Sequence, residues 1–168
     1  VSKNSFDDIV TDHKVDPERL FVVPVGVDPE LFKPLPDIVR RGDQIISTAS
    51  SAVTMKGQRY LWEALAKVRA NRPELAMKLV LVGKLKVGSA AQRTIADLGL
   101  EDSVEFVSGV SDQRIVELYN ESACAVVPSL YEGFSLPAIE AMSTGCPLVA
   151  TTGGALPEVA GRDAETCY

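Results

Sequence analysis

The chain has 168 residues, of which 46% are hydrophobic and 24% are charged, and its formal net charge is −6. This length allows one well-packed domain, and these proportions are ordinary for a soluble globular protein. The acidic balance argues against nucleic acid as a partner, since binding to phosphate backbones requires clustered Lys and Arg. No apolar run approaches the roughly 20 residues that a membrane-spanning helix needs, and the first residues lack the pattern of a signal peptide.

The cysteines and the histidine indicate the redox environment of the protein and bear on whether it has a metal site. Cys124, Cys146 and Cys167 lie in apolar, strand-like surroundings without paired spacing, and His13 is the only histidine. An odd number of cysteines in this arrangement is typical of reduced thiols in a cytoplasmic protein. Because no cluster of Cys and His occurs, the sequence predicts no metal site. We therefore expect an acidic, cytoplasmic domain.

The first forty residues differ in pattern from the rest of the chain. They contain a short helical stretch at 6–10, a β-rich run at 20–23 that predicts a strand, and a segment at 24–34 with three prolines and a glycine. At the other end, residues 165–168 resemble the opening of a further strand. Both ends therefore indicate a piece of a larger protein.

From residue 41 onward, short β-rich runs alternate with helical patterns. Such alternation requires right-handed crossovers and gives a parallel sheet with helices on both faces, and the near-continuous apolar strands agree with burial on both sides. The sequence predicts an α/β, Rossmann-like, doubly wound domain. Its expected strands are 44–48, 78–82, 103–107, 124–127 and 147–150, and its expected helices are 57–71, one ending near Gly99, 112–120, 136–142 and one ending at Ala160.

In a doubly wound fold, ligands bind beyond the carboxyl ends of the strands. This rule places binding residues in the loops that follow the expected strands, at 49–56, 83–88, 107–111, 128–135 and 151–154.

The stretch 128–142 carries the strongest chemical signal. Glu132 lies in a glycine-containing loop, and Glu140 lies in a helix whose other residues from Leu136 to Met142 are all apolar. Ser135 is a natural N-cap and Pro137 suits the first turn. We expect this helix to be buried on most sides, so that Glu140 requires hydrogen-bond donors. The backbone N–H groups at its start would suit a ligand with phosphates.

These residues also carry a family resemblance. The runs 132–142, 145–149 and 153–159 resemble the signature of family 4 retaining glycosyltransferases, also called glycosyl transferases group 1. The resemblance covers roughly residues 15–168 and is to the C-terminal, donor-binding half of an enzyme with the GT-B fold. It implies that residues 1–40 are the end of the N-terminal half and a linker. Residues 41–168 would then be the nucleotide-sugar-binding domain, truncated at its C-terminus.

The resemblance implies transfer of a sugar from a nucleotide-diphosphate-sugar donor, with retention of configuration and without a metal or other cofactor. The acceptor, a sugar or a lipid-linked glycan, would be bound by the missing N-terminal half, so that this piece alone would be inactive. Peripheral membrane association of the complete enzyme stays open.

The resemblance also assigns roles to individual residues. Glu140 would accept hydrogen bonds from the ribose hydroxyls, Glu132 would face the donor sugar, and Lys56 would hold the leaving diphosphate; Glu132 and Lys56 are the catalytic candidates. For Glu140 the alternative is a helix Glu paired with a nearby cation. For Glu132 it is a solvated loop Glu, and for Lys56 it is a surface Lys. Further donor-binding candidates are Gly133, Phe134, Ser135 and Leu136, through backbone N–H groups, and Ser51, Gly83, Lys84 and Val107.

One position departs from the family. The usual pattern has Gly-Arg five to six residues before the Lys, whereas this chain has Ser50 and Ser51. Hydroxyls can donate hydrogen bonds but do not replace a bidentate guanidinium. Lys84, Lys86 or the N-terminal half would have to substitute, or activity would be weak. This departure favours the alternative hypothesis of a non-catalytic nucleotide-sugar-binding module. Two further alternatives are a GT-B-related nucleotide-sugar epimerase and a generic flavodoxin-like or regulatory domain.

Overall fold

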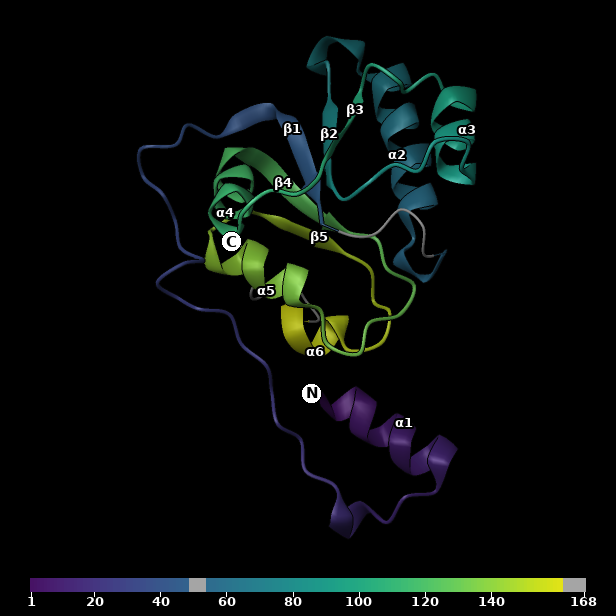
Figure 1. The fold of residues 1–168 in the computed structure, drawn as a ribbon, viewed down its shortest axis with the longest axis vertical. Coiled ribbons are helices and arrows are strands. Elements are labelled where there is room, and N and C mark those ends of the chain that lie inside the picture. Colours follow the sequence, from purple (N-terminus) through teal and green to yellow (C-terminus); the bar gives the residue numbers. More distant parts are fainter. Residues whose placement is uncertain (49–53, 162–168) are drawn as a thin grey trace.

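The computed structural model describes residues 1–48 and 54–161 of the chain, and Figure 1 shows their arrangement. Five parallel strands form one sheet in the order β3-β2-β1-β4-β5. This architecture confirms the predicted Rossmann-like, doubly wound fold. The strands are β1 (Arg41–Ser47), β2 (Lys78–Val82), β3 (Val104–Val107), β4 (Ser122–Val127) and β5 (Leu148–Ala150).

Helices cover both faces of the sheet. The neighbouring residues Ile45 and Ile46 of β1 belong to two different clusters of buried side chains, because successive side chains in a strand point to opposite faces. The cluster around Ile45 contains residues of α2 (Gln58–Asn71) and α3 (Ala90–Asp97). The cluster around Ile46 contains residues of α4 (Asp112–Glu121), α5 (Leu136–Ser143) and α6 (Leu156–Ala160).

The element boundaries lie close to the predicted ones, because the chain marks its helix ends locally. The Ser89 hydroxyl accepts a hydrogen bond from the N–H of Gln92 at the start of α3, and Ser111 caps α4 in the same way. Gly99 follows α3 with a φ of 63°, in the left-handed conformation that glycine tolerates.

The N-terminal segment differs from the prediction. The helix α1 (Lys3–His13) is longer than expected, because the Ser2 hydroxyl caps it by accepting a hydrogen bond from Ser5 N–H. The predicted strand at 20–23 is wrong: this run is neither helix nor strand, and Phe21 is 84% exposed. A β-rich run forms a strand only beside a partner strand, and within the described residues this run has none.

The linker that follows is attached to the sheet domain near α4. The backbone N–H of Leu35 donates to Asn120 Oδ1 at 2.8 Å, and Asn120 Nδ2 donates to the carbonyl of Lys33. Phe32 packs against the core cluster of α4, α5 and α6. Ser50, Ser51, Cys167 and the strand expected at 165–168 lie outside the described residues. Within the described part of the chain, no helix is both long and apolar enough to cross a membrane.

Two loops at the carboxyl edge of the sheet are in close contact. Gly57, at the start of α2, has a φ of 63°, and a Cβ added there would overlap the carbonyl oxygen of Pro128. Two residues further on, Leu130 N–H donates to the carbonyl of Met55 at 2.8 Å. The turn η2 (Thr54–Lys56) is thereby fixed against the loop that follows β4.

We expect Gly57→Ala to destabilise the protein more than Gly99→Ala. Both glycines have a φ of 63°, so each substitution costs about 1–2 kcal/mol of left-handed strain. A Cβ at Gly99 meets no atom within 4 Å, whereas one at Gly57 meets main chain, which adds roughly 1–3 kcal/mol of overpacking. Urea unfolding of the two variants measures the difference. Equal losses would show that the contact with Pro128 relaxes at no cost.

Candidate functional site

The site predicted from the loops lies where the strand order reverses. β1 and β4 are neighbours, and the chain leaves this pair toward β2 and β3 on one side and toward β5 on the other. In doubly wound folds this reversal opens a crevice at the carboxyl edge of the sheet, where ligands bind. The loops after β1 and β4, which carry Lys56 and Glu132, flank this position.

Lys56 and Glu132 form an ion pair in which Lys56 Nζ lies 2.7 Å from Glu132 Oε1. The Ser129 hydroxyl donates to the same oxygen at 2.6 Å. Glu132 is only 8% exposed, and the Lys56 side chain is 34% exposed. Glu132 is therefore not a solvated loop Glu, and Lys56 lies partly at the surface but has an ion-pair partner. The structure brings the two catalytic candidates together, and two donors compensate the burial of the carboxylate.

The main chain around Glu132 is held from the β5–α6 side. Ala155 N–H donates to the Glu132 carbonyl at 2.8 Å. Gly154 has a φ of 64°, and a Cβ there would overlap that carbonyl. Glycine is required at this position because the two loops approach so closely.

The start of α5 corrects one prediction. Ser135 stands at the N-cap position but has a φ of 93° and a ψ of 82°, and its side chain makes no capping hydrogen bond. Its Oγ is buried without a partner in the described part of the chain, because the left-handed backbone turns the side chain away from the helix N–H groups. A non-glycine residue in such a conformation costs about 1–3 kcal/mol, and such residues cluster at functional sites.

The burial of α5 is also smaller than predicted. Leu136 is 42% exposed, and within α5 the fully buried residues are Ala138 and Ala141. These two small side chains face the core, and the other residues of α5 apart from Leu136 are half-buried. Pro137 is in the first turn as predicted, and Gly133 and Phe134 are half-buried beside it.

Glu140 has a partner that the sequence reasoning missed. The Tyr119 hydroxyl of α4 lies 3.0 Å from Glu140 Oε2 and 3.0 Å from Thr48 Oγ1. Because an ionised carboxylate only accepts, Tyr119 donates to Glu140 and accepts from Thr48. Tyr119 is 1% exposed and lies within the helix expected at 112–120, where its hydroxyl was given no role. The available signal was that a buried tyrosine usually needs a partner for its hydroxyl.

This environment changes the titration of both groups. Burial raises the pKa of Glu140, the hydrogen bond from Tyr119 lowers it, and the charge of Asp112 raises it, with a net increase. Burial and the neighbouring Glu140 carboxylate raise the pKa of Tyr119 well above its usual value. Tyr119 therefore stays protonated and acts as a fixed donor to Glu140.

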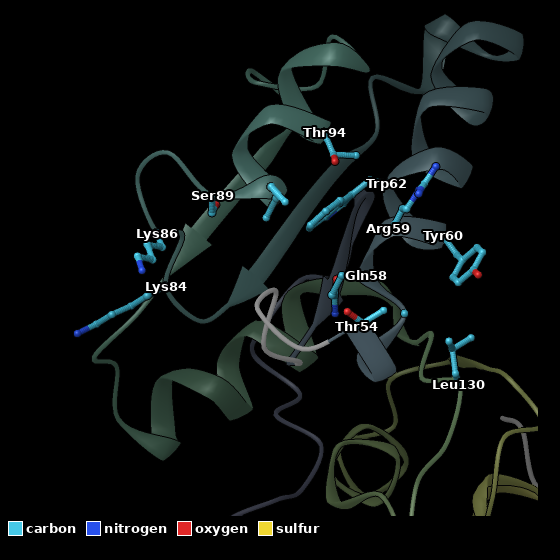
Figure 2. A pocket seen from close by; sticks show the side chains of 13 residues that line it. Thr54, Gln58, Arg59, Tyr60, Trp62, Lys84, Lys86, Ser89, Thr94 and Leu130 are labelled. Atoms are coloured by element: carbon cyan, nitrogen blue, oxygen red, sulfur yellow. The ribbon is translucent and has the colours of Figure 1, made fainter.

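The other predicted residues lie along the same edge of the sheet. Gly83 N–H donates to the Val107 carbonyl at 2.8 Å, so these two candidates lie side by side. Lys84 follows on the β2–α3 loop and lines a cavity with Lys86 (Figure 2). Ser51 lies outside the described residues.

The helix α1 contacts the loop of Glu132, which no sequence pattern predicted. Ser2 Oγ and Ser5 Oγ donate to the Gly133 carbonyl at 2.6 Å and 3.0 Å. The Glu158 carboxylate accepts the N–H groups of Lys3 and Asn4 at the N-terminus of α1, where a negative charge is stabilised. These contacts join residues more than a hundred positions apart, so local sequence carries no sign of them.

The comparisons with known proteins agree with this geometry. The family model for glycosyl transferases group 1 matches residues 37–166. The chain belongs to this family. It is 47% identical, over 98% of its length, to the MMP alpha-(1->4)-mannosyltransferase of Mycolicibacterium hassiacum, and it covers 39% of that protein. The chain therefore spans about two fifths of the length of this curated relative.

Solved structures show the same fold. The glycosyltransferase WaaG matches with a TM-score of 0.80 at 22% identity, over 95% of this chain and 45% of that one. A solved C-terminal domain of a group 1 glycosyltransferase from Francisella tularensis matches with a TM-score of 0.64 at 25% identity, over 79% of this chain and 74% of that one. The described domain of the group 1 glycosyltransferase chain is therefore a C-terminal GT-B domain.

We expect Lys56 and Glu132 to be energetically coupled. In a double-mutant cycle, Lys56→Met should lower the free energy of unfolding less in the Glu132→Gln background than in wild type. The difference, the coupling energy of the pair, should be about 0.5–3 kcal/mol. The matched control is the exposed pair Arg59–Glu63, whose coupling should be much smaller because solvent screens it. Urea unfolding of both cycles provides the measurement. Equal coupling in the two pairs would contradict a special role of burial at Glu132.

We also expect Glu140 to make stability depend on pH. Because its pKa is raised above the ordinary value of 4.5, its contribution to the free energy of unfolding is fully present below pH 4.5 and is lost as pH rises through the raised pKa. The free energy of unfolding of wild type should therefore fall relative to that of Glu140→Gln as pH rises through this window. In Tyr119→Phe, which lacks the hydrogen bond that lowers the pKa, the window should move to higher pH. Unfolding curves measured at a series of pH values test both; an unmoved window would mean that Tyr119 does not stabilise the charged form.

Proposed function

We propose that this group 1 glycosyltransferase chain holds the donor site of a retaining enzyme that transfers a sugar from a nucleotide-diphosphate sugar. The observation that carries the proposal is the arrangement of two fixed carboxylates at the β1/β4 reversal. Glu140 is held by Tyr119, and Glu132 is held by Lys56 and Ser129. The 47% identity to a mannosyltransferase favours a mannosyl residue as the transferred sugar.

Glu140 would bind the ribose of the nucleotide. Ribose hydroxyls donate hydrogen bonds, and an ionised, partly desolvated carboxylate is a strong acceptor for them. Tyr119 occupies Oε2 and fixes the orientation of the carboxylate, so that Oε1 would be the acceptor for a ribose hydroxyl. The Tyr119–Thr48 contact would transmit this orientation from β1, and the base would lie toward the main chain of Val107.

Lys56 and Glu132 would act on the reacting part of the donor. As the bond between sugar and diphosphate breaks, negative charge grows on the leaving phosphate and positive charge grows on the sugar. A lysine and a carboxylate in contact can stabilise one charge each. Donor phosphate would compete with Glu132 for Lys56, while Ser129 would keep the carboxylate in place.

The backbone from Gly133 to Leu136 would complete the phosphate site. Free N–H groups at a helix start favour anions, and the strained conformation of Ser135 orients this part of the chain. Together with Lys56 they would offset the charge of the diphosphate without a metal ion. The acceptor, a sugar or a lipid-linked glycan, would be bound by the remainder of the protein.

A second candidate function is a nucleotide-sugar-binding module without catalysis. The observation that favours it is Ser50-Ser51, which stands where the family pattern has Gly-Arg. Without the arginine, stabilisation of the leaving group would rest on Lys56 and the backbone N–H groups at the start of α5. Both candidates require the same donor site and differ in turnover by the whole protein.

Calorimetric titration with UDP-, GDP- and ADP-mannose tests the donor site. We expect saturable binding to one of the three, weakened by about 1–3 kcal/mol in Glu140→Ala and weakened less in Tyr119→Phe. The matched control is Glu101→Ala. Glu101 is an exposed carboxylate just before β3, so it lies at the amino ends of the strands, away from the carboxyl ends that carry the candidate site. The affinity should fall as the pH decreases through the raised pKa of Glu140, because the protonated acid accepts poorly.

Two results would contradict the proposal. One is a folded protein that binds none of the three nucleotide sugars. The other is equal affinity loss in Glu140→Ala and Glu101→Ala. Turnover with an acceptor, assayed with the whole protein, then separates the transferase from the non-catalytic module.

A further inference from the structure

A cavity of about 520 Å³ lies between α2 and α3, on the face of the sheet opposite to α4 and α5 (Figure 2). Trp62 extends from α2 toward the helix that carries Thr94, and Ser89 lies at the start of that same helix. Lys84 and Lys86 come from the β2–α3 loop. The volume of the cavity is within the usual range for small-molecule sites.

The charge of the cavity is opposite to that of the chain. Among the described residues that line it are Arg59, Lys84 and Lys86 but no Asp or Glu, although the chain has a net charge of −6. The N-terminal turns of α2 and α3 both border the cavity, and the positive ends of their dipoles add to the same field. This combination attracts an anion.

Two buried side chains that line the cavity have unsatisfied polar atoms. Gln58 and Trp62 are each 3% exposed, and Gln58 Oε1 and Trp62 Nε1 have no partner in the described part of the chain. Gln58 Nε2 donates to Ser47 Oγ at 3.0 Å, which fixes the amide. Buried polar atoms without partners are rare, and these two belong to side chains of the cavity wall.

We propose that this cavity binds a small phosphate ester that carries hydroxyl groups, at a site separate from that of Glu140 and Glu132. Lys84 and Lys86 would hold the phosphate, Ser89 and Thr94 would contact hydroxyls, and the indole of Trp62 would cover an apolar face of the ligand. The cavity adjoins the proposed donor site at Thr54 and Gly57, at Leu130 of the loop that follows β4, and at Lys84, itself a donor-binding candidate. A ligand there would contact the start of α2, directly after Lys56.

Trp62 is the only tryptophan of the chain, so its fluorescence reports directly on this cavity. A hexose 6-phosphate, which does not absorb in this range, should change the fluorescence saturably, and free hexose at equal concentration should not. Lys86→Gln should weaken the binding about tenfold, as expected for a lost charged hydrogen bond. Lys67→Gln, an exposed lysine of α2 outside the lining, should leave it unchanged. Thr94→Phe, which fills the cavity, should abolish binding while circular dichroism stays unaltered.

The phosphate could also belong to the nucleotide-sugar donor, and Glu140→Gln separates the two sources. This variant should lose nucleotide-sugar binding but keep the response to the hexose phosphate. The proposal is overturned if Glu140→Gln loses that response, because the phosphate would then bind at the donor site. It is also overturned by no saturable response, by an equal response to free hexose, or by equal effects of Lys86→Gln and Lys67→Gln.

Discussion

The contact between the loops after β1 and β4 determines the geometry of the candidate site. Gly57 packs directly on the Pro128 carbonyl, and the N–H of Leu130 donates to Met55. With the two main chains fixed against each other, Lys56 is placed within 2.7 Å of Glu132. A residue with a side chain at Gly57 would separate the loops and with them the ion pair. The chemistry of the site therefore depends on one residue that has no functional group.

The structure stabilises the buried carboxylate of Glu132 and the half-buried carboxylate of Glu140 in different ways. Glu132 is paired with a cation and a hydroxyl beside the proposed sugar position. Glu140 receives a hydrogen bond from a neutral phenol, and its pKa is raised. The ion pair lies partly at the surface, because the Lys56 side chain is 34% exposed. The Tyr119 phenol is buried in the core, and its hydrogen bond holds one oxygen of Glu140 in place.

The N-terminal helix α1 connects a distant part of the chain to this site. Its hydroxyls at Ser2 and Ser5 hold the Gly133 carbonyl, and Glu158 caps its first turn. Within α1 no residue is buried, so polar contacts attach it to the loop that carries Glu132. Such contacts are individually weak, and they orient the peptide after Glu132 without adding to the hydrophobic core.

The sequence alone determined the fold class and most element boundaries, and it marked Glu132 and Glu140 as candidates for the site. These features follow from local patterns: apolar runs, serine caps at Ser89 and Ser111, and a glycine after α3.

Tertiary structure decided which segments pair and which side chains of the candidate site are in contact. The run at 20–23 has the composition of a strand but no neighbour to pair with, and Ser135 has the composition of a cap but a backbone that prevents capping. Tyr119 became the partner of Glu140, and Lys56 the partner of Glu132, because packing brings together side chains that are 21 and 76 positions apart. Local propensity carries no information about such contacts.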